Sequence, residues 1–278
     1  MVTLAELREK HKKLLEDKES PNSGDRKSDF VTLNQGSNLI RILPGKEDAL
    51  QFFVQVAMHK YQDQEGKWKT YQCRRTHNEK CPMCDLYFDL WKMHKELNLG
   101  KDSSGKNNKS KFGDLATKIR AKDRFFIKAV IRDLQAKGED AVKYIAMSSE
   151  PFNILMAALT DPEMVDDSDP DNTTILSLDR GNDFDLKITQ KGEYPSFSES
   201  KAKVKKSKAG TPQEILAWME SPLDLNSLVK LSDYDEGKKV VETLMATVQQ
   251  VAKTSDEVNP PFKTEEEDDA RFKQGLKA

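Results

Sequence analysis

Cysteine and histidine are scarce in this chain of 278 residues, which contains three cysteines and four histidines. All three cysteines, Cys73, Cys81 and Cys84, fall within one window of 12 residues. In a reducing compartment, clustered cysteines are more often metal ligands than disulfide partners. The small number and the clustering therefore predict a metal site and argue against a framework of disulfides.

Long apolar runs are missing as well. The sequence contains no apolar stretch long enough for a membrane span, and its first residues do not form the apolar region of a secretory signal. Hydrophobic residues make up 36% of the chain and the mean hydropathy is −0.75. We therefore expect an intracellular protein with one large core and solvated ends, and no contact with membranes.

Net charge is small, at −2, but the charges are segregated along the chain. Residues 101–128 contain nine lysines and arginines against three aspartates, and residues 201–208 contain five lysines and no acid. Acidic residues are concentrated at 161–171 and 265–269. A basic central part with an acidic periphery fits nucleic-acid binding together with an acidic tail.

The spacing of the cysteines is typical of a structural zinc site, in which thiolate and imidazole ligands fill four tetrahedral positions. Residues 81–84 form a Cys-Pro-Met-Cys turn that presents two sulfur atoms, and Cys73 supplies a third. We expect one Zn²⁺ that stabilises the fold and does not catalyse, because a closed ligand set leaves no position for water. The alternative is a redox pair of Cys81 and Cys84.

Two histidines compete for the fourth ligand position. His59 and Cys73 are equidistant from Gly66, so antiparallel strands that turn about this glycine would make them cross-strand neighbours. This register favours His59. His77 is separated by three residues from Cys73 and from Cys81, and the spacing does not exclude it.

Hydrophobic periodicity indicates a mixture of helices and strands. It predicts strands at residues 38–43, 51–59, 67–73, 124–133, 142–147 and 184–189, and helices at 3–18, 85–97, 151–159, 211–219 and 236–253. Residues 98–113 are predicted to form a loop, and the acidic segment 161–171 a solvated turn. The fold class that we predict is α+β, with an OB-type β-barrel core, an inserted zinc-binding subdomain and flanking helices.

Three parts are expected along the chain. Residues 1–20 form a basic helical arm, residues 21–253 form the core with the zinc subdomain at about 59–97, and residues 254–278 form a disordered acidic tail.

Binding of single-stranded nucleic acid requires cations along the backbone and aromatic faces on which bases stack. Three groups of residues combine these features, and in an extended strand the members of the first group would share one face while Phe125 points into the core. The candidate DNA contacts are Arg120, Lys122, Arg124 and Phe126; Tyr194, Phe197 and Lys201; and Trp68 with Tyr71. For any one group alone, core aromatics and solvated lysines are the slightly favoured interpretation.

Several segments together match a known family. The strongest matches are residues 38–44, His59 with residues 66–68, Cys73 with residues 76–77, and residues 81–84; weaker matches are 120–126 and 194–201. From about residue 38 to 205 the chain therefore resembles the T-even bacteriophage single-stranded DNA-binding protein family, also called helix-destabilising proteins.

The resemblance implies an OB-type core, a zinc subdomain with the upstream histidine and three cysteines as ligands, and a cationic cleft with stacking aromatics. It implies no enzyme activity, but cooperative and largely sequence-independent coating of single-stranded DNA in phage replication, recombination and repair. The implied partners are single-stranded DNA, other copies of the chain, and phage replication and recombination proteins bound by the acidic tail, in the cytoplasm of the infected bacterial host. The family's compact basic N-terminal sequence is replaced here by Arg8, Lys10, Lys12 and Lys13.

Another class of protein is compatible with the same cysteines. A zinc-ribbon adaptor would use the Cys-Pro-Met-Cys turn to bind replication or transcription proteins, and its lysines would only be solvated. It predicts no salt-dependent DNA binding and no quenching of Trp68 by single strands. A metal-dependent hydrolase would need an open zinc position and a general base, and the sequence indicates neither.

Overall fold

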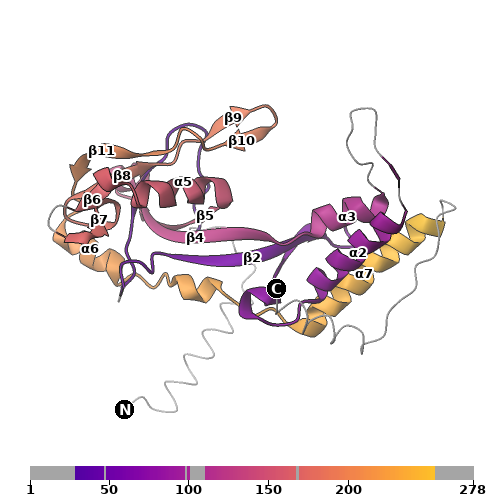
Figure 1. Cartoon of the computed structure of the whole chain (residues 1–278). Helices are drawn as coiled ribbons and strands as arrows, with labels where there is room; N and C mark the ends of the chain where they lie inside the picture. Colours follow the sequence, from indigo (N-terminus) through magenta and orange to yellow (C-terminus); the bar gives the residue numbers. More distant parts are fainter. Residues whose placement is uncertain (1–28, 47, 98, 101–109, 167–168, 254–278) are drawn as a thin grey trace, which may run out of the picture.

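The structure is a computed structural model that describes residues 29–46, 48–97, 99–100, 110–166 and 169–253. The predicted N-terminal arm with Arg8, Lys10, Lys12 and Lys13, the predicted tail at 254–278, and residues 101–109 lie outside the described residues. The described part is an α+β protein in which helices surround a mostly antiparallel sheet (Figure 1).

Seven strands form the main sheet, in the order β11-β8-β1-β4-β2-β3, with β5 on the other edge of β4. Their bounds are β1 (Leu39–Ile42), β2 (Phe53–Gln62), β3 (Trp68–Gln72), β4 (Lys122–Ile131), β5 (Val142–Met147), β8 (Gly181–Asp185) and β11 (Lys201–Ser207). β3 and β11 are at opposite ends of the order, so this sheet is open among the described residues. The mixed α+β class is confirmed, whereas closure into an OB-type barrel is not.

Two smaller hairpins and the helices complete the described chain. The hairpins are β6 (Val165–Asp166) with β7 (Asp169–Thr173), and β9 (Thr189–Lys191) with β10 (Tyr194–Ser196). The helices are α2 (Pro82–Glu96), α3 (Lys111–Ile119), α4 (Arg132–Ala136), α5 (Ser149–Leu159), α6 (Pro212–Met219), α7 (Tyr234–Lys253) and the short 3₁₀ helices η1 (Arg74–His77), η2 (Pro162–Met164), η3 (Thr174–Leu176) and η4 (Leu225–Leu228). Among the residues that the structure describes, no helix is long and apolar enough to cross a membrane.

β4 is the central strand, and its side chains alternate between two environments. Phe125, Ile127 and Ala129 belong to the main hydrophobic core, where the ring of Phe125 stacks on that of Phe152 of α5 at 3.8 Å between centroids. Residues of opposite parity, such as Lys128, must point to the other face of the sheet. The prediction that Phe125 is a core residue is confirmed.

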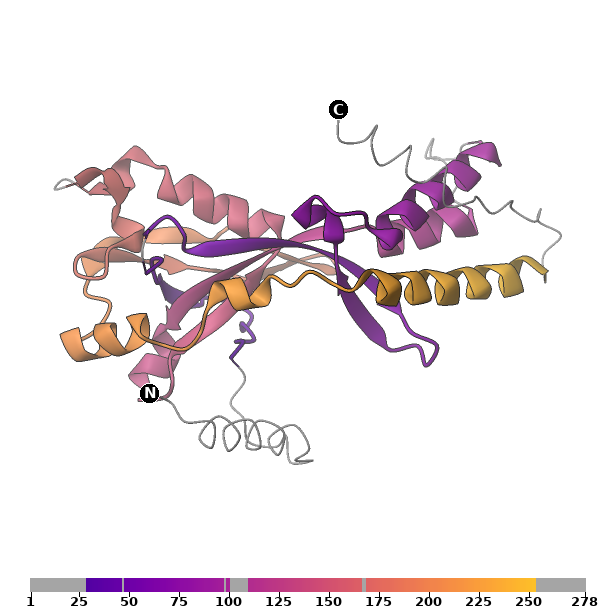
Figure 2. The same cartoon turned by 90° about the horizontal axis from the view of Figure 1, so that it is seen from below.

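The face opposite α5 is crossed by residues 220–233, which we call the crossing segment. It links α6 to α7 and contains η4, and Figure 2 shows it running across the sheet. The hydroxyl of Tyr144 on β5 donates to the carbonyl of Asp224 at 3.0 Å. The amide of Gln72 on β3 donates to the carbonyl of Leu228 and accepts from the backbone N–H of Lys230, both at 2.8 Å. These contacts fix the crossing segment to strands β5 and β3 of the sheet.

A second hydrophobic core lies where α2, α3 and α7 meet the ends of β2 and β3. The sequence predicted α2 and α7 but missed α3, part of which it assigned to a loop. The side chain of Ser110 accepts from the backbone N–H of Gly113 at the start of α3, and Phe112, Ala116 and Ile119 form its buried stripe. Burial of this stripe stabilises a helix of only nine residues.

Two further predictions of secondary structure were wrong. The acidic segment forms the β6–β7 hairpin in place of a simple turn. The strand predicted at 184–189 is divided, because β8 ends at Asp185 and β9 begins at Thr189. The other predicted strands and helices within the described residues are confirmed to within a few residues.

Candidate metal centre and nucleic-acid surface

Four side chains from three neighbouring elements meet in the second hydrophobic core. His59 lies on β2, Cys73 follows β3 as the N-cap of η1, Cys81 is the N-cap of α2, and Cys84 lies in the first turn of that helix. Pro82 occupies the first helical position, where the missing backbone N–H is tolerated and its fixed φ favours the start of a helix. The Cys-Pro-Met-Cys run therefore turns directly into α2 and presents both sulfurs to one side.

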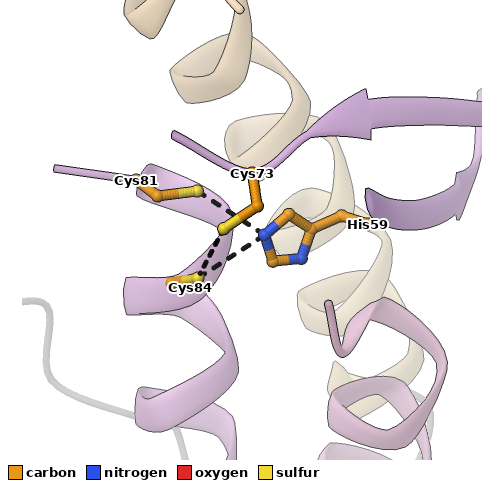
Figure 3. A group of neighbouring side chains, drawn as sticks. All are labelled: His59, Cys73, Cys81 and Cys84. Carbon is orange, nitrogen blue, oxygen red and sulfur yellow. Dashed lines mark hydrogen bonds between the residues drawn. The ribbon is translucent and has the colours of Figure 1, made fainter. Parts of the chain in front are cut away.

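The ligand atoms of these four residues all lie within 4.8 Å of one another (Figure 3). His59 Nε2 is 3.5 Å from the sulfurs of Cys81 and Cys84, and the sulfurs of Cys73 and Cys84 are 3.4 Å apart. Zinc–sulfur bonds of about 2.3 Å in a tetrahedron place neighbouring ligand atoms roughly 3.8 Å apart. The cluster therefore has the size and donor set of a tetrahedral zinc site.

The orientation of the His59 ring is fixed from outside the cluster. Its Nδ1 lies 2.7 Å from the backbone carbonyl of Ile119, at the end of α3. A carbonyl can only accept, so Nδ1–H donates, and in the neutral ring the lone pair of Nε2 faces the sulfurs. Such a hydrogen bond fixes the tautomer that a metal needs. Sequence reasoning missed Ile119 because a backbone carbonyl has no signature in the residue type.

Burial makes the cluster unfavourable without a cation. The exposed fractions are 0% for His59 and Cys81, 3% for Cys73 and 8% for Cys84. Hydrogen bonds from Cys73 and Cys84 lower the pKa of Cys81, whereas hydrogen bonds to Cys73 and Cys81, together with burial, raise the pKa of Cys84. Burial lowers the pKa of His59, but contacts with Cys73 and Cys81 outweigh it and raise this pKa to about 9. Neighbouring buried thiols cannot all ionise beside one another, and a bound divalent metal removes that repulsion.

The histidine of the cluster is His59, as favoured, but the predicted hairpin register was wrong. His59 pairs with Tyr71 and not with Cys73, whose backbone N–H donates to Ala57 at 2.8 Å. His77 lies in η1 with an exposed side chain, outside the cluster.

The register differs because Gly66 ends the turn and is not its centre. The backbone N–H of Asp63 donates to the carbonyl of Lys67 at 2.9 Å, and Gly66 has a φ of 77°. A three-residue hairpin loop needs a left-handed residue at its last position, which glycine supplies without steric cost. The strands therefore pair about residue 65, and side-chain alternation still brings Cys73 to the His59 face.

Three of the predicted DNA contacts share one face of the sheet. Trp68 pairs with Gln62, Lys122 with Met58, and Arg124 with Val56. Gln62, Met58 and Val56 are separated by even numbers of positions along β2, so their side chains point to one face of the sheet. Residues directly opposite each other on neighbouring strands share a face, so Trp68, Lys122 and Arg124 point to that face too. Trp68 is 61% exposed and Lys122 is exposed, while Arg124 is half-buried.

One exposed lysine on this face was missed by sequence reasoning. Lys60 pairs with Thr70, two residues before Gln62, and therefore lies between the rows of Trp68 and Lys122. The alternation of side chains along the β2–β3 hairpin was the signal that could have identified Lys60.

Three other predicted contacts lie in different environments. Arg120 is exposed but caps the C-terminus of α3, so it is not part of the strand face that the sequence predicted. Phe126 is 7% exposed and lies against the ring of Phe30, 5.9 Å away. Tyr71 is 4% exposed, and its hydroxyl donates to the carbonyl of Asp233 at 2.9 Å. The rings of Phe126 and Tyr71 are covered by the protein and do not offer free stacking surfaces.

The remaining group lies far along the strand order from β3, on β11 and on the separate β9–β10 hairpin. Tyr194 is 75% exposed on β10, Phe197 packs against the main core, and Lys201 is exposed at the start of β11. Figure 1 shows β9 and β10 above α5, away from the crossing segment. β11 and β3 are at opposite ends of the strand order, so the structure separates this group from Trp68.

The open antiparallel sheet, the buried Cys₃His cluster and the exposed aromatic and basic side chains define an α+β protein with a candidate metal site and a surface suited to nucleic acid. The profile of one family, described as gp32 DNA binding protein like, matches residues 34–251. The match covers most of the chain, and the protein belongs to this family of DNA-binding proteins. It confirms the resemblance found in the sequence. A search among curated proteins found no match.

Proposed function

We propose that the protein binds single-stranded DNA cooperatively and with little sequence preference, and coats it during phage DNA replication, recombination and repair. Membership of a DNA-binding family is the observation on which this rests. The exposed rings of Trp68 and Tyr194 beside exposed lysines support the single-stranded form of DNA, because stacking on aromatic faces requires unpaired bases.

We assign the proposed DNA contacts by the exposure of their side chains. Trp68, Lys60, Lys122 and Arg124 form one surface, and Tyr194, Phe197 and Lys201 form a second; Arg120 adds a cation at the end of α3. Phe126 and Tyr71 are assigned to the scaffold because their rings are buried.

The finer architecture is part of the same proposal. The sheet acts as an OB-type scaffold, and one Zn²⁺ bound by His59, Cys73, Cys81 and Cys84 holds β2, β3 and α2 together without taking part in catalysis. Neighbouring protein molecules on the DNA strand contact one another through the basic residues Arg8, Lys10, Lys12 and Lys13. The acidic tail binds phage replication and recombination proteins in the host cytoplasm.

Quenching of tryptophan fluorescence tests the function. Titration with oligo(dT) should quench Trp68, and duplex DNA of equal length should quench it far less. Higher salt should weaken the quenching. Lysine and arginine side chains that bind phosphates release condensed counterions from the DNA, and added salt opposes this release.

Another tryptophan, Trp218, provides the control. Trp68→Phe should lose most of the quenching, whereas Trp218→Phe, at a half-buried position, should retain it. If folded, zinc-loaded protein gives no quenching and no salt-dependent binding, the zinc-ribbon adaptor replaces this proposal.

A further inference from the structure

An exposed valine lies on the strand at one end of the main sheet. Val204 of β11 is 89% exposed, more than any other large apolar side chain in the part of the chain that the structure describes. β11 bulges at this point, because Ala202 pairs with Phe184 and Lys206 with Asn182, so that three residues of β11 oppose one residue of β8. A bulge in an outer strand changes the direction of the side chains that it carries.

Hydrogen bonds from the neighbouring strand hold the bulge in place. Asn182 is 1% exposed, and its side-chain amide donates to the carbonyls of Lys203 and Val204 at 2.7 and 3.2 Å. A bulge and several lysines protect an outer strand from pairing with other strands, but an exposed valine adds nothing to that protection. The position of Val204 therefore needs another explanation, and burial against a partner would provide one.

Residues 203–206, which we call the bulge tip, are strongly basic. Lys203 forms an ion pair with Asp185 at 2.7 Å. Lys205 and Lys206 are exposed, and neither forms an ion pair within 4.0 Å with any residue that the structure describes. The bulge tip therefore presents one apolar side chain among positive charges. A matching partner surface would combine an apolar depression with acidic side chains.

An apolar depression of this kind lies beside α7. A cavity of about 300 Å³, which we call the α7 groove, lies between the turn of the β2–β3 hairpin and the first half of α7. Leu244 in its lining is buried, whereas Tyr61 and Val240 are half-buried. All three belong to the second hydrophobic core or pack against it, so the groove exposes part of that core.

Acidic side chains give the α7 groove a negative charge. Its lining contains three acids and one lysine, namely Asp63, Glu65, Glu236 and Lys239. Two of the acids have a lysine neighbour at the surface of the hairpin, and such surface pairs contribute little. Glu236 forms no ion pair within 4.0 Å among the described residues. Burial raises the pKa of Tyr61, and the negative charges of Glu236 and Asp63 raise it further.

The bulge tip and the α7 groove of one molecule are too far apart to meet. β11 and β3 are the end strands of the main sheet, separated by five strand spacings of about 4.8 Å each. Figure 1 shows β11 and α7 at opposite ends of the molecule. A second copy of the chain offers each surface its counterpart. A contact between two different surfaces repeats head to tail, and it produces an open line of molecules unless the rotation closes a ring.

We propose that the bulge tip of one molecule inserts into the α7 groove of the next, with Val204 against the apolar side chains and the lysines of the tip beside Glu236. The contact is small, so it forms mainly between molecules that one DNA strand holds side by side. It thus adds a second contact between copies to the cooperative coating proposed above, and in this respect it rests on the proposed function.

The ratio of the affinity for long poly(dT) to that for an oligo(dT) that holds one molecule measures contact between copies. Val204→Ser should lower this ratio about tenfold, as expected for the loss of a buried valine, and should leave the affinity for the short oligonucleotide unchanged. Val165→Ser, at another exposed valine, is the matched control and should preserve the ratio. Thermal melts of both variants check that they are folded.

Charge reversal tests whether these two surfaces face each other. Glu236→Lys and Lys205→Glu should each lower the ratio, because like charges then meet at every contact. Both changes in one chain should restore it, since each contact again joins opposite charges. Glu242→Lys, at an exposed position of α7 outside the groove, is the matched control. A combined variant with a ratio no higher than that of the single variants would contradict the proposal.

Sedimentation at high protein concentration without DNA separates this proposal from the proposed function. The unchanged protein should associate weakly, and Val204→Ser should abolish the association; this result supports the contact even if no oligo(dT) binds. The proposal is overturned if Val204→Ser and Glu236→Lys change neither the ratio nor the association. It is also overturned if Val204→Ser weakens binding of the short oligonucleotide and leaves the ratio unchanged, because Val204 then contacts DNA.

Discussion

Asp183 is a single carboxylate shared by two guanidinium groups. Its Oδ1 accepts from Arg41 Nε at 2.9 Å and from Arg132 Nη2 at 2.8 Å. Arg41 is 0% exposed, and its remaining donors bind the carbonyls of Gly181 and Ser207 among others. Burial lowers the pKa of Arg41 and its attraction to Asp183 opposes this change, so the carboxylate is what allows a buried cation on β1.

Asp183→Ala should therefore lower the free energy of unfolding by about 3–5 kcal/mol, because it leaves a buried charge uncompensated. Urea unfolding measures this loss. The control is Asp179→Ala, since the Asp179–Lys208 pair has side chains 75% and 72% exposed and should contribute little. Equal losses in both variants would show that the buried network is no more important than a surface pair.

Cys81 offers a residue-scale test of the metal. Cys81→Ser should bind less than one equivalent of zinc and melt at a clearly lower temperature, and a chelator should lower the melting temperature of the unchanged protein in the same way. The part of the variant that stays folded should retain most of its affinity for oligo(dT), because the ligands are buried away from the proposed DNA surface. Metal analysis and melting curves check the first claim; identical curves with and without chelator would contradict a structural metal.

At the scale of elements, α7 packs beside the Cys₃His cluster, in the second hydrophobic core. Gly237 is buried in its first turn, and a Cβ atom there would lie 2.6 Å from the hydroxyl oxygen of Tyr71 and 2.7 Å from Pro82 Cγ. Pro82 directly follows the candidate ligand Cys81, so the packing of α7 on this site depends on the absence of a side chain at Gly237.

Gly237→Ala should destabilise the protein by about 1–3 kcal/mol through overpacking, although alanine is favoured over glycine inside helices by about 1 kcal/mol. Chemical unfolding determines the sign. Lys239→Ala, an exposed substitution in the same helix, should change little. A stabilising effect of Gly237→Ala would mean that helix propensity dominates and that α7 does not pack closely on Tyr71.

The elements also show where sequence patterns suffice. The candidate metal cluster could be predicted because Cys-Pro-Met-Cys ahead of an apolar periodic run indicates a turn that presents two sulfur atoms, although the helix begins at Pro82 and not at residue 85 as predicted. The hairpin register could not, because it depends on whether Gly66 is the centre or the last residue of the loop. α3 was missed because its stabilisation comes from packing against α2 and β2, a tertiary effect that nine residues of sequence do not reveal.

At the scale of the whole molecule, the proposed DNA surface should be detectable in the salt dependence of binding. Lys122 and Arg124 lie on one face, and each phosphate that they neutralise should contribute about −0.7 to the slope of log K against log salt concentration. Lys122→Ala should weaken oligo(dT) binding and make the slope less negative by about that amount. Binding isotherms over a salt series measure it, with Lys137→Ala as the control; an unchanged slope for Lys122→Ala would remove this strand face from the DNA surface.

The site as a whole was only partly predictable. Basic and aromatic residues indicated nucleic acid, but alternation alone could not reveal that Phe126 is covered by Phe30, a residue about a hundred positions away in the chain. The sequence also did not indicate that Tyr194 lies on a hairpin separate from the main sheet, whereas Trp68 begins the strand at one end of that sheet. Both facts depend on how distant segments pack, which local patterns do not encode.

The central claim is a preference for single strands. Competition of unlabelled single-stranded and duplex DNA of equal length and composition against labelled oligo(dT), followed by fluorescence anisotropy at one salt concentration, tests it most directly. We predict that the single strand displaces the label at a far lower concentration than the duplex. Equal displacement by the two forms would contradict the account and leave a DNA-binding protein that does not distinguish unpaired bases.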